Sequence, residues 1–587
     1  IPTPNLDALG YYGIILNRHY TAPMCTPSRA SLVTGKNSIH TGMQQYVIAS
    51  DEPWGLGLDE TLMPEYFRAA GYSTNLVGKW HLGFYKEDYT PTRRGFDSFF
   101  GYWGPYIDYW SHTLKMGSKP YDRGLDMRNN FEVMKNTTGI YATDLFCDRA
   151  VDLIQNHNQV QPLFLLLSHL APHTGNEDDP FQAPVDEIDK FKYIKDPTRR
   201  VYAAMVSRLD TSVGKIVAAL DERKMLNNTI LLFVNDNGAP TIGLHSNTGS
   251  NYPLRGQKDS QWEGAVRGNA IVWSRLLEKK NRVSNQWMHI TDWLPTLAGA
   301  IDAKIDLDLD GEIDGIDQWK ELSFDVGNKR RKVLNVIDEK RGFTSYVRDG
   351  WKYINGTLSN GLYDGWLGTN NQHFVDDLEY IERVQKSLTS QILSKYDGRL
   401  RNDQILNLRR EATINCDSKS VNNKNGETCN YLNGPCLYNI VDDPCEQNNL
   451  ASADPERLES LRQEVVELQK TALKPRNRPG DPKSDPALHD LTWTNWRSSD
   501  HPDEEHQTYL FKSMPPTLQI IVGSILILLS LIIIVSGLIY LSNLSIRKIA
   551  LKVRNRKPDA TTLKTSDCDE KKTNSISDNV KYDEQRY

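Results

Sequence analysis

The chain contains 587 residues and carries a formal net charge of −6 at pH 7. Single hydrophobic cores rarely grow beyond about 250–300 residues, so this length predicts two globular units with additional segments. The mild negative charge argues against a general nucleic-acid-binding protein, and an anionic substrate would have to be met by local basic residues.

The first informative segment covers residues 25–35, Cys-Thr-Pro-Ser-Arg-Ala-Ser-Leu-Val-Thr-Gly. Pro27 near its start and Gly35 just past its end predict a short helix with Cys25 at the positive N-terminus, where an anion is favoured. Arg29 follows one helical turn later on the same face and could hold an oxyanion beside Cys25. The alternative for Cys25 is a small buried side chain without chemistry.

The next segment combines a predicted strand with a polar loop. Residues 73–77 precede the sequence Gly-Lys-Trp-His-Leu-Gly at 78–83. Alternate side chains of an extended backbone share a face, so Lys79 and His81 should point into one site. A surface turn with an ordinary lysine is the competing interpretation.

A pattern typical of α/β proteins occupies the following region. Apolar runs at 162–167 and 229–234 predict strands, and residues 201–220 between them have the spacing of an amphipathic helix. This alternation predicts an α/β fold with a largely parallel sheet. Ligands of such sheets gather at the carboxyl ends of the strands.

Polar side chains follow both of these predicted strands. His169 and His173 follow the first, whereas Asp236 and Asn237 follow the second in the sequence Asn-Asp-Asn-Gly. Carboxylate and amide oxygens suit calcium, although Asp-Asn-Gly alone is a common turn. His169 lies nearer the strand and is expected to be structural.

Two later segments carry further charged groups. Lys258 ends the sequence Pro-Leu-Arg-Gly-Gln-Lys, and the nearby Arg255 and Arg267 are expected to form structural ion pairs. Residues 306–317 place acidic residues and a glycine at the spacing of an EF-hand loop. We interpret this match as incidental, because short motifs inside another fold usually are.

Together these segments resemble the type I sulfatases, and residues 1–44 resemble the arylsulfatase B, I and J branch of that family. The resemblance extends from residue 1 to residue 470. It implies an α/β, alkaline phosphatase-like fold with a large, mostly parallel mixed sheet flanked by helices. A smaller C-terminal domain with an antiparallel sheet is also implied.

The resemblance further implies the chemistry of the site. The formylglycine-generating enzyme would convert Cys25 to formylglycine, which acts as a built-in cofactor. The implied catalytic residues are Cys25, Arg29, His81 and His173; the sulfate-binding residues are Lys79, His173 and Lys258; and the Ca²⁺ ligands are Asp236, Asn237 and the modified Cys25. Two more aspartates, from the D-D-x-G segment of the family, are expected upstream of Ile1, so this chain alone is expected to hold calcium poorly.

Changes in composition predict how the rest of the chain is organised. Short runs at 333–337, 346–353 and 436–440 predict an antiparallel sheet, and residues 455–473 predict an amphipathic helix. The expected divisions are a catalytic domain lacking its N-terminal strand (1–330), a smaller α+β domain (331–474), a Pro- and charge-rich stalk (475–516), a transmembrane helix (517–542) and a cytosolic tail (543–587).

The apolar segment near the C-terminus sets the expected topology. Residues 518–541 contain 24 consecutive uncharged positions, and a helix of this length at ~1.5 Å per residue spans about 36 Å, enough for a bilayer. Basic residues follow at 547–557, so the positive-inside rule places the C-terminus in the cytosol. The expected protein is a single-pass type I membrane protein whose catalytic domain is extracellular or lumenal.

Cysteines and glycosylation motifs agree with that topology. Closely spaced cysteines predict disulfides in an oxidising compartment, with a zinc site as the alternative. These cysteines are Cys416, Cys429, Cys436 and Cys445, and candidate glycosylation sites are Asn136, Asn227 and Asn355.

The sequence therefore predicts a calcium-dependent sulfuric ester hydrolase. It would remove sulfate from a sulfated sugar, with N-acetylgalactosamine 4-sulfate of glycosaminoglycans as the first candidate. A phosphatase or phosphodiesterase on the related scaffold is disfavoured, because it would use an unmodified serine or threonine and two metals. A catalytically silent membrane glycoprotein that binds sulfated glycans is the alternative from another class.

Overall fold

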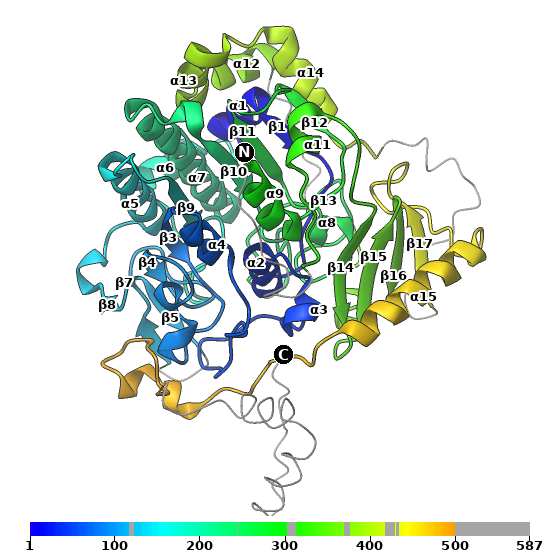
Figure 1. Ribbon diagram of the computed structural model, residues 1–587, viewed down its shortest axis with the longest axis horizontal. Coiled ribbons are helices and arrows are strands. Elements are labelled where there is room, and N and C mark those ends of the chain that lie inside the picture. Colours follow the sequence, from blue (N-terminus) through cyan, green and yellow to red (C-terminus); the bar gives the residue numbers. More distant parts are fainter. Residues whose placement is uncertain are drawn as a thin grey trace, which may run out of the picture. The chain divides into compact units, whose positions relative to one another are not determined.

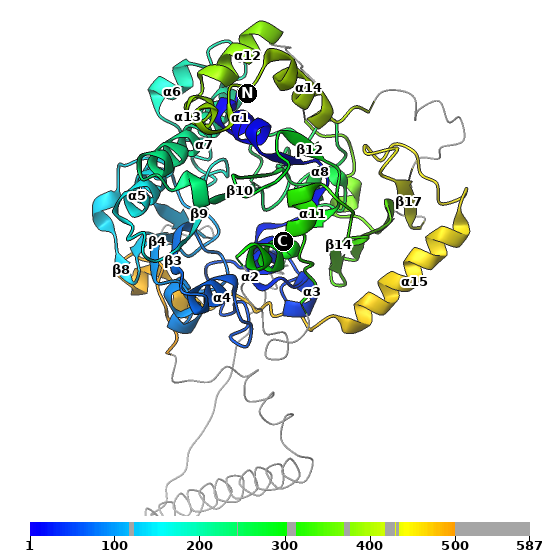
Figure 2. The ribbon, with the colours of Figure 1, turned by 45° about the horizontal axis from the view of Figure 1, so that its top comes forward.

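The computed structural model describes residues 1–116, 122–243, 245–301, 313–368, 376–416, 429 and 434–498. These residues belong to a compact unit that covers Ile1–His501. Figures 1 and 2 show two sheets near its middle, helices against them, and a further sheet with a long helix to one side.

The larger of the two central sheets has five strands in the order β8-β7-β4-β3-β9. Strand β3 pairs in parallel with both β4 and β9, whereas β7 and β8 extend the sheet with antiparallel pairs. The strands are β3 (Ser73–Lys79), β4 (Ser98–Tyr102), β7 (Arg128–Asn129), β8 (Glu132–Val133) and β9 (Leu163–Ser168). The carboxyl ends of β3, β4 and β9 therefore meet at one edge of the sheet. The sequence predicted β3 and β9 but not β4.

The second central sheet has four strands in the order β10-β11-β1-β12. Its pairs are antiparallel between β10 and β11 and between β11 and β1, and parallel between β1 and β12. The strands are β1 (Ile14–Leu16), β10 (Ile230–Val234), β11 (Ala270–Ser274) and β12 (Arg282–Ser284). Two short pairs complete the central strands: β2 (His19–Tyr20) with β13 (Met288–His289), and β5 (Thr113–Lys115) with β6 (Arg123–Leu125).

Helices flank these sheets, as the α/β prediction requires. Helix α7 (Pro197–Glu222) starts at Asp196, whose carboxylate accepts hydrogen bonds from the N–H groups of Thr198 and Arg199 at 2.9 and 3.1 Å. It packs with α5 (Ala142–Asn156), which also contacts β3, β4 and β9. The other helices are α1 (Pro4–Tyr12), α2 (Cys25–Thr34), α3 (Ser38–Thr41), α4 (Met63–Ala69), α6 (Val185–Asp189), α8 (Glu263–Val266), α9 (Trp293–Ala300) and α11 (Trp319–Phe324).

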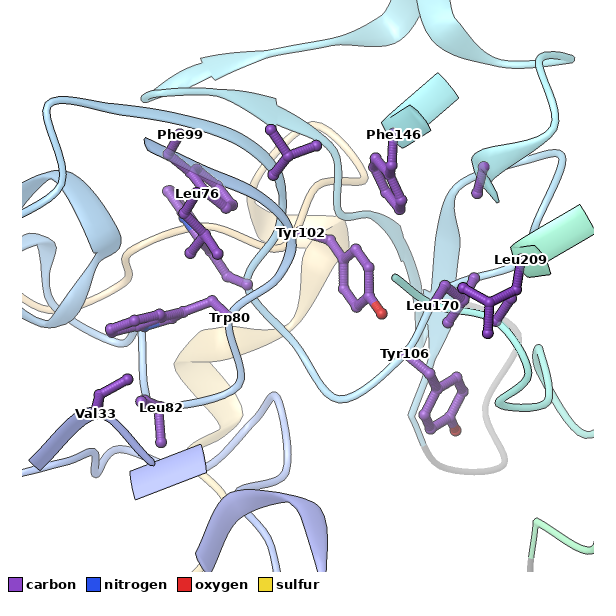
Figure 3. Close-up of a cluster of buried hydrophobic side chains, with 14 of the residues drawn as sticks. Val33, Leu76, Trp80, Leu82, Phe99, Tyr102, Tyr106, Phe146, Leu170 and Leu209 are labelled. Atoms are coloured by element: carbon purple, nitrogen blue, oxygen red, sulfur yellow. The ribbon is translucent and has the colours of Figure 1, made fainter. Parts of the chain in front are cut away.

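A large hydrophobic core holds the sheets and helices together. Figure 3 shows part of it, where Leu76 of β3 and Phe99 of β4 lie near Trp80. Phe146 of α5 stacks on Tyr102 at the end of β4, with ring centroids 6.0 Å apart. Burial of so many aromatic rings fixes the carboxyl ends of the strands, which carry the site.

A separate antiparallel sheet forms in the C-terminal part. Its order is β14-β15-β16-β17, with strands β14 (Lys332–Asp338), β15 (Phe343–Arg348), β16 (Trp351–Asn355) and β17 (Cys436–Asn439). Helix α15 (Pro455–Thr471) packs on β15 and β16, as expected. The predicted run at 346–353 is two strands joined by a tight turn, since Asp349 and Gly350 adopt φ values of 51° and 83°.

Part of the predicted second domain lies elsewhere. Helices α12 (Asp377–Lys386), α13 (Leu388–Asp397) and α14 (Asn402–Ala412) pack near α1, α7 and β12 (Figures 1 and 2). Their apolar faces bury Ile381, Ile392 and Ile405 in one cluster with Leu9 and Val217. These three helices, which fall within the predicted range 331–474, therefore pack on elements of the predicted range 1–330.

The described part of the segment predicted as a stalk, residues 475–498 of 475–516, contacts the catalytic part. Residues 474–498 run back along the catalytic part, and the Trp493 side chain is only 2% exposed. Its indole N–H donates to the carbonyl of Leu114 at 2.9 Å, and Asn495 donates to the carbonyl of Phe84 at 2.6 Å. Composition suggested a solvated stalk, but the tryptophans anchor this segment.

The remaining predictions about the C-terminal part have mixed outcomes. Disulfides join Cys416 to Cys445 and Cys429 to Cys436, so the zinc alternative is wrong. Segments 517–542 and 543–587 lie outside the described residues. Within the parts of the chain that are described, no helix is both long and apolar enough to cross a membrane.

The EF-hand-like segment at 306–317 is described only in part, because residues 302–312 lie outside the described residues. Within its described end, the Asp314 carboxylate accepts the N–H of Asn37.

Candidate functional site

Helix α2 forms where the sequence predicts it and presents Cys25 at its first turn. The helix ends at Gly35, which takes a left-handed conformation with φ 69° and donates its N–H to the carbonyl of Ser31. Cys25 has a free thiol and is 4% exposed. Next to it, the hydroxyl of Thr26 accepts the N–H of Ile48 at 3.2 Å, which anchors the following loop against the helix.

Arg29 joins the carboxyl ends of the two central sheets. Its Nη2 donates to Asp236 at 2.8 Å, just after β10, and its Nη1 donates to the hydroxyl of Ser168 at 2.7 Å, the last residue of β9. Nη1 also lies 3.5 Å from the carbonyl oxygen of Lys79 at the end of β3. One planar guanidinium thus connects three strand ends beside Cys25.

Lys79 is enclosed at the end of β3. Its side chain is buried, and among the described residues its ammonium has no hydrogen-bond partner. Burial lowers the pKa of Lys79 to about 8, opposed by the Cys25 thiol and reinforced by Arg29. The group is therefore a desolvated cation facing the nucleophile position.

His81 lies two residues beyond β3 in a left-handed conformation with φ 64°. Its Nε2–H donates to the carbonyl of Ile48 at 2.9 Å, because that oxygen can only accept. Burial, followed by the charge of Lys79, holds the pKa of His81 well below its usual value. The neutral ring therefore carries its lone pair on Nδ1, which is buried without a partner among the described residues.

Asp236 and Asn237 follow strand β10, as predicted. Burial alone would raise the pKa of Asp236, but the charges of Arg29, Lys79 and Lys258 lower it below its usual value. The side-chain amide of Asn237 donates to the carbonyl of Gly238 at 2.9 Å, and its Oδ1 is buried without a partner among the described residues. Both residues therefore place oxygen atoms at the end of β10, where a cation could bind them.

Lys258 completes the group of cations. Its backbone N–H donates to the carbonyl of Ala239 at 3.2 Å, and the next N–H, of Asp259, donates to Pro23 at 2.9 Å. The loop is thus tied both to the end of β10 and to the entry of α2. The Lys258 side chain is buried, and its ammonium has no hydrogen-bond partner in the described part of the chain.

The two predicted histidines after β9 differ in their surroundings. His173 donates from Nδ1 to the carbonyl of Thr174 at 2.8 Å and stacks on Tyr106, with centroids 5.4 Å apart. Burial and the charges of Lys258 and Lys79 hold the pKa of His173 well below its usual value. His169 instead contacts the Ser212 hydroxyl on α7 at 2.8 Å, which agrees with a structural role.

The predictions for the two nearby arginines have different outcomes. Arg267 forms the expected ion pair, 3.6 Å from Glu263. Arg255 does not: its guanidinium lies between the rings of Trp262 and Trp366, 3.6 and 4.9 Å from their centroids. It donates to backbone carbonyls, among them Asp364 at 2.6 Å.

The sequence did not single out three further side chains at the site. Tyr46 lies near Cys25, and burial and Asp259 raise the pKa of its hydroxyl to about 12. Tyr106 follows β4, and His245 lies beyond Asn237 in the loop after β10. For Tyr106 and His245 the position after a strand end was the available signal, but aromatic residues are too common there to be specific; Tyr46, which follows helix α3, offered no such signal.

Known proteins resemble this chain in sequence and in fold. The sulfatase family profile matches residues 1–303. Arylsulfatase J of Mus musculus is 34% identical over 498 residues, 84% of this chain and 76% of that protein. N-acetylgalactosamine-6-sulfatase of Homo sapiens is 30% identical over 310 residues, 50% of this chain and 56% of that protein.

Two crystal structures show the likeness of the fold. Ps i-CgsB has a TM-score of 0.60 and 22% identity, covering 88% of this chain and 93% of its own. PsFucS1 sulfatase from Pseudoalteromonas sp. has a TM-score of 0.54 and 22% identity, covering 81% and 87%. These neighbours confirm the predicted alkaline phosphatase-like α/β fold. The chain belongs to the sulfatase family and is a sulfuric ester hydrolase.

Proposed function

We propose that this enzyme removes sulfate from a sulfated sugar with a formylglycine nucleophile made from Cys25. N-acetylgalactosamine 4-sulfate of glycosaminoglycans is the first candidate substrate. The observation that carries the proposal is the enclosure of a free cysteine, at a helix N-terminus, among Arg29, Lys79 and Lys258.

The charge of the site suits a sulfuryl group. Of the three cations, only Arg29 forms an ion pair with Asp236, so Lys79 and Lys258 leave excess positive charge at the site. Neither lysine ammonium has a hydrogen-bond partner among the described residues, and buried cations are normally paired. The oxygens of a sulfate ester would supply those partners and would be stabilised as charge develops on them.

The modified residue would supply what a thiol cannot. As a hydrated aldehyde, residue 25 offers one hydroxyl that attacks sulfur and a second that lets the aldehyde re-form and expel sulfate. The N-terminus of α2 favours negative charge at this position.

Two histidines and a lysine are suited to move the protons. Nδ1 of His81 carries a lone pair and lacks a partner among the described residues, so it is our candidate base for the release of sulfate. His173 is neutral in the free site, which makes the ammonium of Lys258 the better proton donor to the departing alcohol. Nε2 of His173 would then accept a hydrogen bond from substrate or from Lys258.

Calcium is a proposed cofactor of this site. Asp236, the unpartnered Oδ1 of Asn237 and the modified residue 25 form an oxygen-rich set that fits a hard cation. The described residues contain no group of three or more His, Cys, Asp or Glu side chains able to hold a metal, so these would form part of its shell. Bound calcium would add positive charge at the sulfuryl oxygens.

We further propose that the catalytic part lies in an extracellular or lumenal compartment. The two disulfides support an oxidising environment, and Asn136, Asn227 and Asn355 are all exposed, as glycosylation requires. Residues 517–542 are the proposed single membrane anchor in the lipid bilayer, with residues 543–587 as the cytosolic tail. The formylglycine-generating enzyme is the proposed partner during maturation.

Mass analysis combined with turnover tests the proposed function. The full-length protein, produced in a secretory host, should yield a peptide in which residue 25 is an aldehyde, and it should hydrolyse an aryl sulfate but not the matching aryl phosphate. Cys25→Ala should abolish turnover, whereas Cys147→Ala, at the second free cysteine among the described residues, should not. Unmodified Cys25 in active enzyme would sink the mechanism, and glycan binding without turnover would favour the silent glycoprotein.

A further inference from the structure

A wall of aromatic side chains with polar ends adjoins the cations. Tyr106 stacks on His173, with an interplanar angle of 15°. His245 meets Tyr106 edge-on, with centroids 4.8 Å apart, and lies 5.5 Å from His173. In Figure 3 the Tyr106 ring lies near Leu170, and its hydroxyl points away from the other labelled side chains.

The loop that carries His245 is fixed in place by hydrogen bonds. The N–H of Asn247 donates to Pro240 at 2.9 Å, and its side-chain amide donates to the carbonyl of Pro172 at 3.4 Å, next to His173. His245 itself takes a left-handed conformation with φ 55°. Histidine tolerates this conformation better than most residues do, so the imidazole is directed by a defined turn.

Tyr363 approaches the same loop from the C-terminal part of the chain. A Cβ atom built on Gly243 would lie only 2.6 Å from the Tyr363 hydroxyl. Only glycine leaves room there, and Gly243 also has a φ of 79°. Residues distant in sequence thus bring Tyr106, His245 and Tyr363 around one loop.

The polar ends of this wall have no hydrogen-bond partners among the described residues. This holds for the Tyr106 hydroxyl, the Tyr363 hydroxyl and the ring nitrogens of His245. A site whose polar groups await hydrogen bonds discriminates strongly for a ligand that can make them. An alcohol with several hydroxyl or amide groups meets that requirement.

The wall is uncharged at neutral pH, in contrast to its surroundings. Burial and the charges of Lys258 and Lys79 lower the pKa of His245 to about 4, and burial raises the pKa of Tyr106 far above neutrality. Glu177 and Asp108 contribute to the shift of Tyr106, whereas Arg123 opposes it and pairs with Asp108 at 2.8 Å. The uncharged wall itself offers no ion-pair partner to a second sulfate or a carboxylate, so it favours a neutral group that can form hydrogen bonds.

We infer that Tyr106, His245 and Tyr363 form the subsite for the alcohol part of the ester, and that this alcohol is a neutral sugar ring. The inference rests on the proposed function, because the cations must hold the sulfate for the wall to face the sugar. His245 would bind sugar hydroxyls as both donor and acceptor, and the tyrosine hydroxyls would add further contacts.

Specificity ratios test this subsite. The numerator of the ratio is kcat/KM for N-acetylgalactosamine 4-sulfate or 6-sulfate, whichever is the better substrate. The denominator is kcat/KM for 4-methylumbelliferyl sulfate, whose aryl group lacks hydroxyls. We expect the ratio to fall about tenfold in His245→Ala and about fivefold in Tyr363→Phe, as for lost neutral hydrogen bonds. His245→Asn, which keeps the left-handed backbone and a donor and acceptor, should lose less.

Matched controls are His157→Ala, at a half-buried residue, and Tyr193→Phe, at an exposed one; both lie outside this wall and should keep the wild-type ratio. Unchanged ratios in His245→Ala and Tyr363→Phe, or equal losses on both ester types, would overturn the inference. The inference would also be overturned if the wild-type enzyme cleaved the aryl ester but neither sugar sulfate. Hydrolysis of a sulfate ester would still be established in that case. Failure to cleave any of the esters would instead overturn the proposed function and the inference with it.

Discussion

Both Nε and Nη2 of Arg29 donate to the same carboxylate oxygen of Asp236, at 3.1 and 2.8 Å. The pair fixes that oxygen on the side of α2, while Nη1 of the same guanidinium holds Ser168 at 2.7 Å. Arg29 therefore aligns two sheets as well as contributing charge.

Replacing Arg29 by lysine should separate these two roles. Lysine keeps the charge but has one nitrogen, so it cannot hold Asp236 and Ser168 together. We expect kcat/KM for an aryl sulfate to fall by about 10²-fold, comparable to losing one preorganised donor in an oxyanion site. Arg401→Lys, at an exposed pair with Asp403, is the control; wild-type rates in Arg29→Lys would refute the bridging role.

The rate should depend on the charge of Lys79. Because the pKa of Lys79 lies at about 8, its charge is present below that pH and is lost above it. We expect kcat/KM to fall above pH 8 by about tenfold per pH unit. This descending limb of the pH profile reports a group of the free enzyme, because the quantity plotted is kcat/KM. Lys79→Arg keeps its charge at high pH and should move the limb upward. An unmoved limb would show that another group titrates.

Arg341 should position Lys258 through its neighbour. Its Nη1 lies 2.7 and 2.9 Å from the two carboxylate oxygens of Asp259, the residue after Lys258. In Arg341→Gln we expect KM and the inhibition constant of inorganic sulfate to rise together about fivefold, about 1 kcal/mol, with a smaller change in kcat.

Two comparisons check this assignment of Arg341. Arg341→Lys should recover part of the loss, and Arg331→Gln, at an exposed pair with Asp349, should change nothing. A lower Tm with an unchanged sulfate inhibition constant would mean that Arg341 is merely structural.

Trp493 should stabilise the catalytic part. The side chain is 2% exposed and its N–H is bound to Leu114. Trp493→Ala should lower the free energy of unfolding by about 3–5 kcal/mol, measured in urea. Leu488→Ala, at a side chain that is 67% exposed, should cost less than about 0.5 kcal/mol. Equal effects of the two changes would contradict the anchoring role.

A buried charge cluster predicts a pH-dependent stability. The ammonium of Lys352 lies 2.9 Å from Glu263 and 2.7 Å from Glu446. Burial, opposed by Lys352, raises the pKa of Glu446 from 4.5 to about 7. The folded state therefore binds a proton on the Glu446 carboxyl more tightly than the unfolded state does. The stability that this proton contributes is lost as pH rises from 4.5 through 7.

Glu446→Gln should remove this dependence of the unfolding free energy on pH. The difference in unfolding free energy between wild type and variant, measured in urea at several pH values, should change across the same range. Glu467→Gln, at an exposed pair with Lys470, is the control and should run parallel to wild type. Parallel curves for Glu446→Gln would refute the assignment.

The candidate site residues could be proposed from the sequence because they lie at strand ends. Lys79 ends β3, whereas His173 and Asp236 follow β9 and β10, and such ends carry the ligand sites of α/β folds. Short-range pattern was therefore enough to propose them. The bridge from Arg29 to Ser168 was not predictable, since the partners are 139 positions apart.

Packing partners were the main part of the fold that the sequence did not reveal. Periodicity predicts which face of a helix is apolar but not what covers it, so the packing of α12–α14 against α1 and α7 could not be predicted. Likewise, the Pro-rich composition around Trp493 indicated a stalk, whereas one buried indole was enough to dock it. His245 was missed because its role depends on a turn.

The burial of Cys25 has a consequence for the order of events during biosynthesis. A thiol that is 4% exposed inside a finished helix is out of reach of another enzyme's active site. The proposed oxidation must therefore precede closure of the loops around α2. Those loops include the one that carries Arg255 and Lys258, and its Arg255 guanidinium packs on the ring of Trp366 from the C-terminal part of the chain. The nascent chain thus offers residue 25 for modification only until its later segments are made and docked.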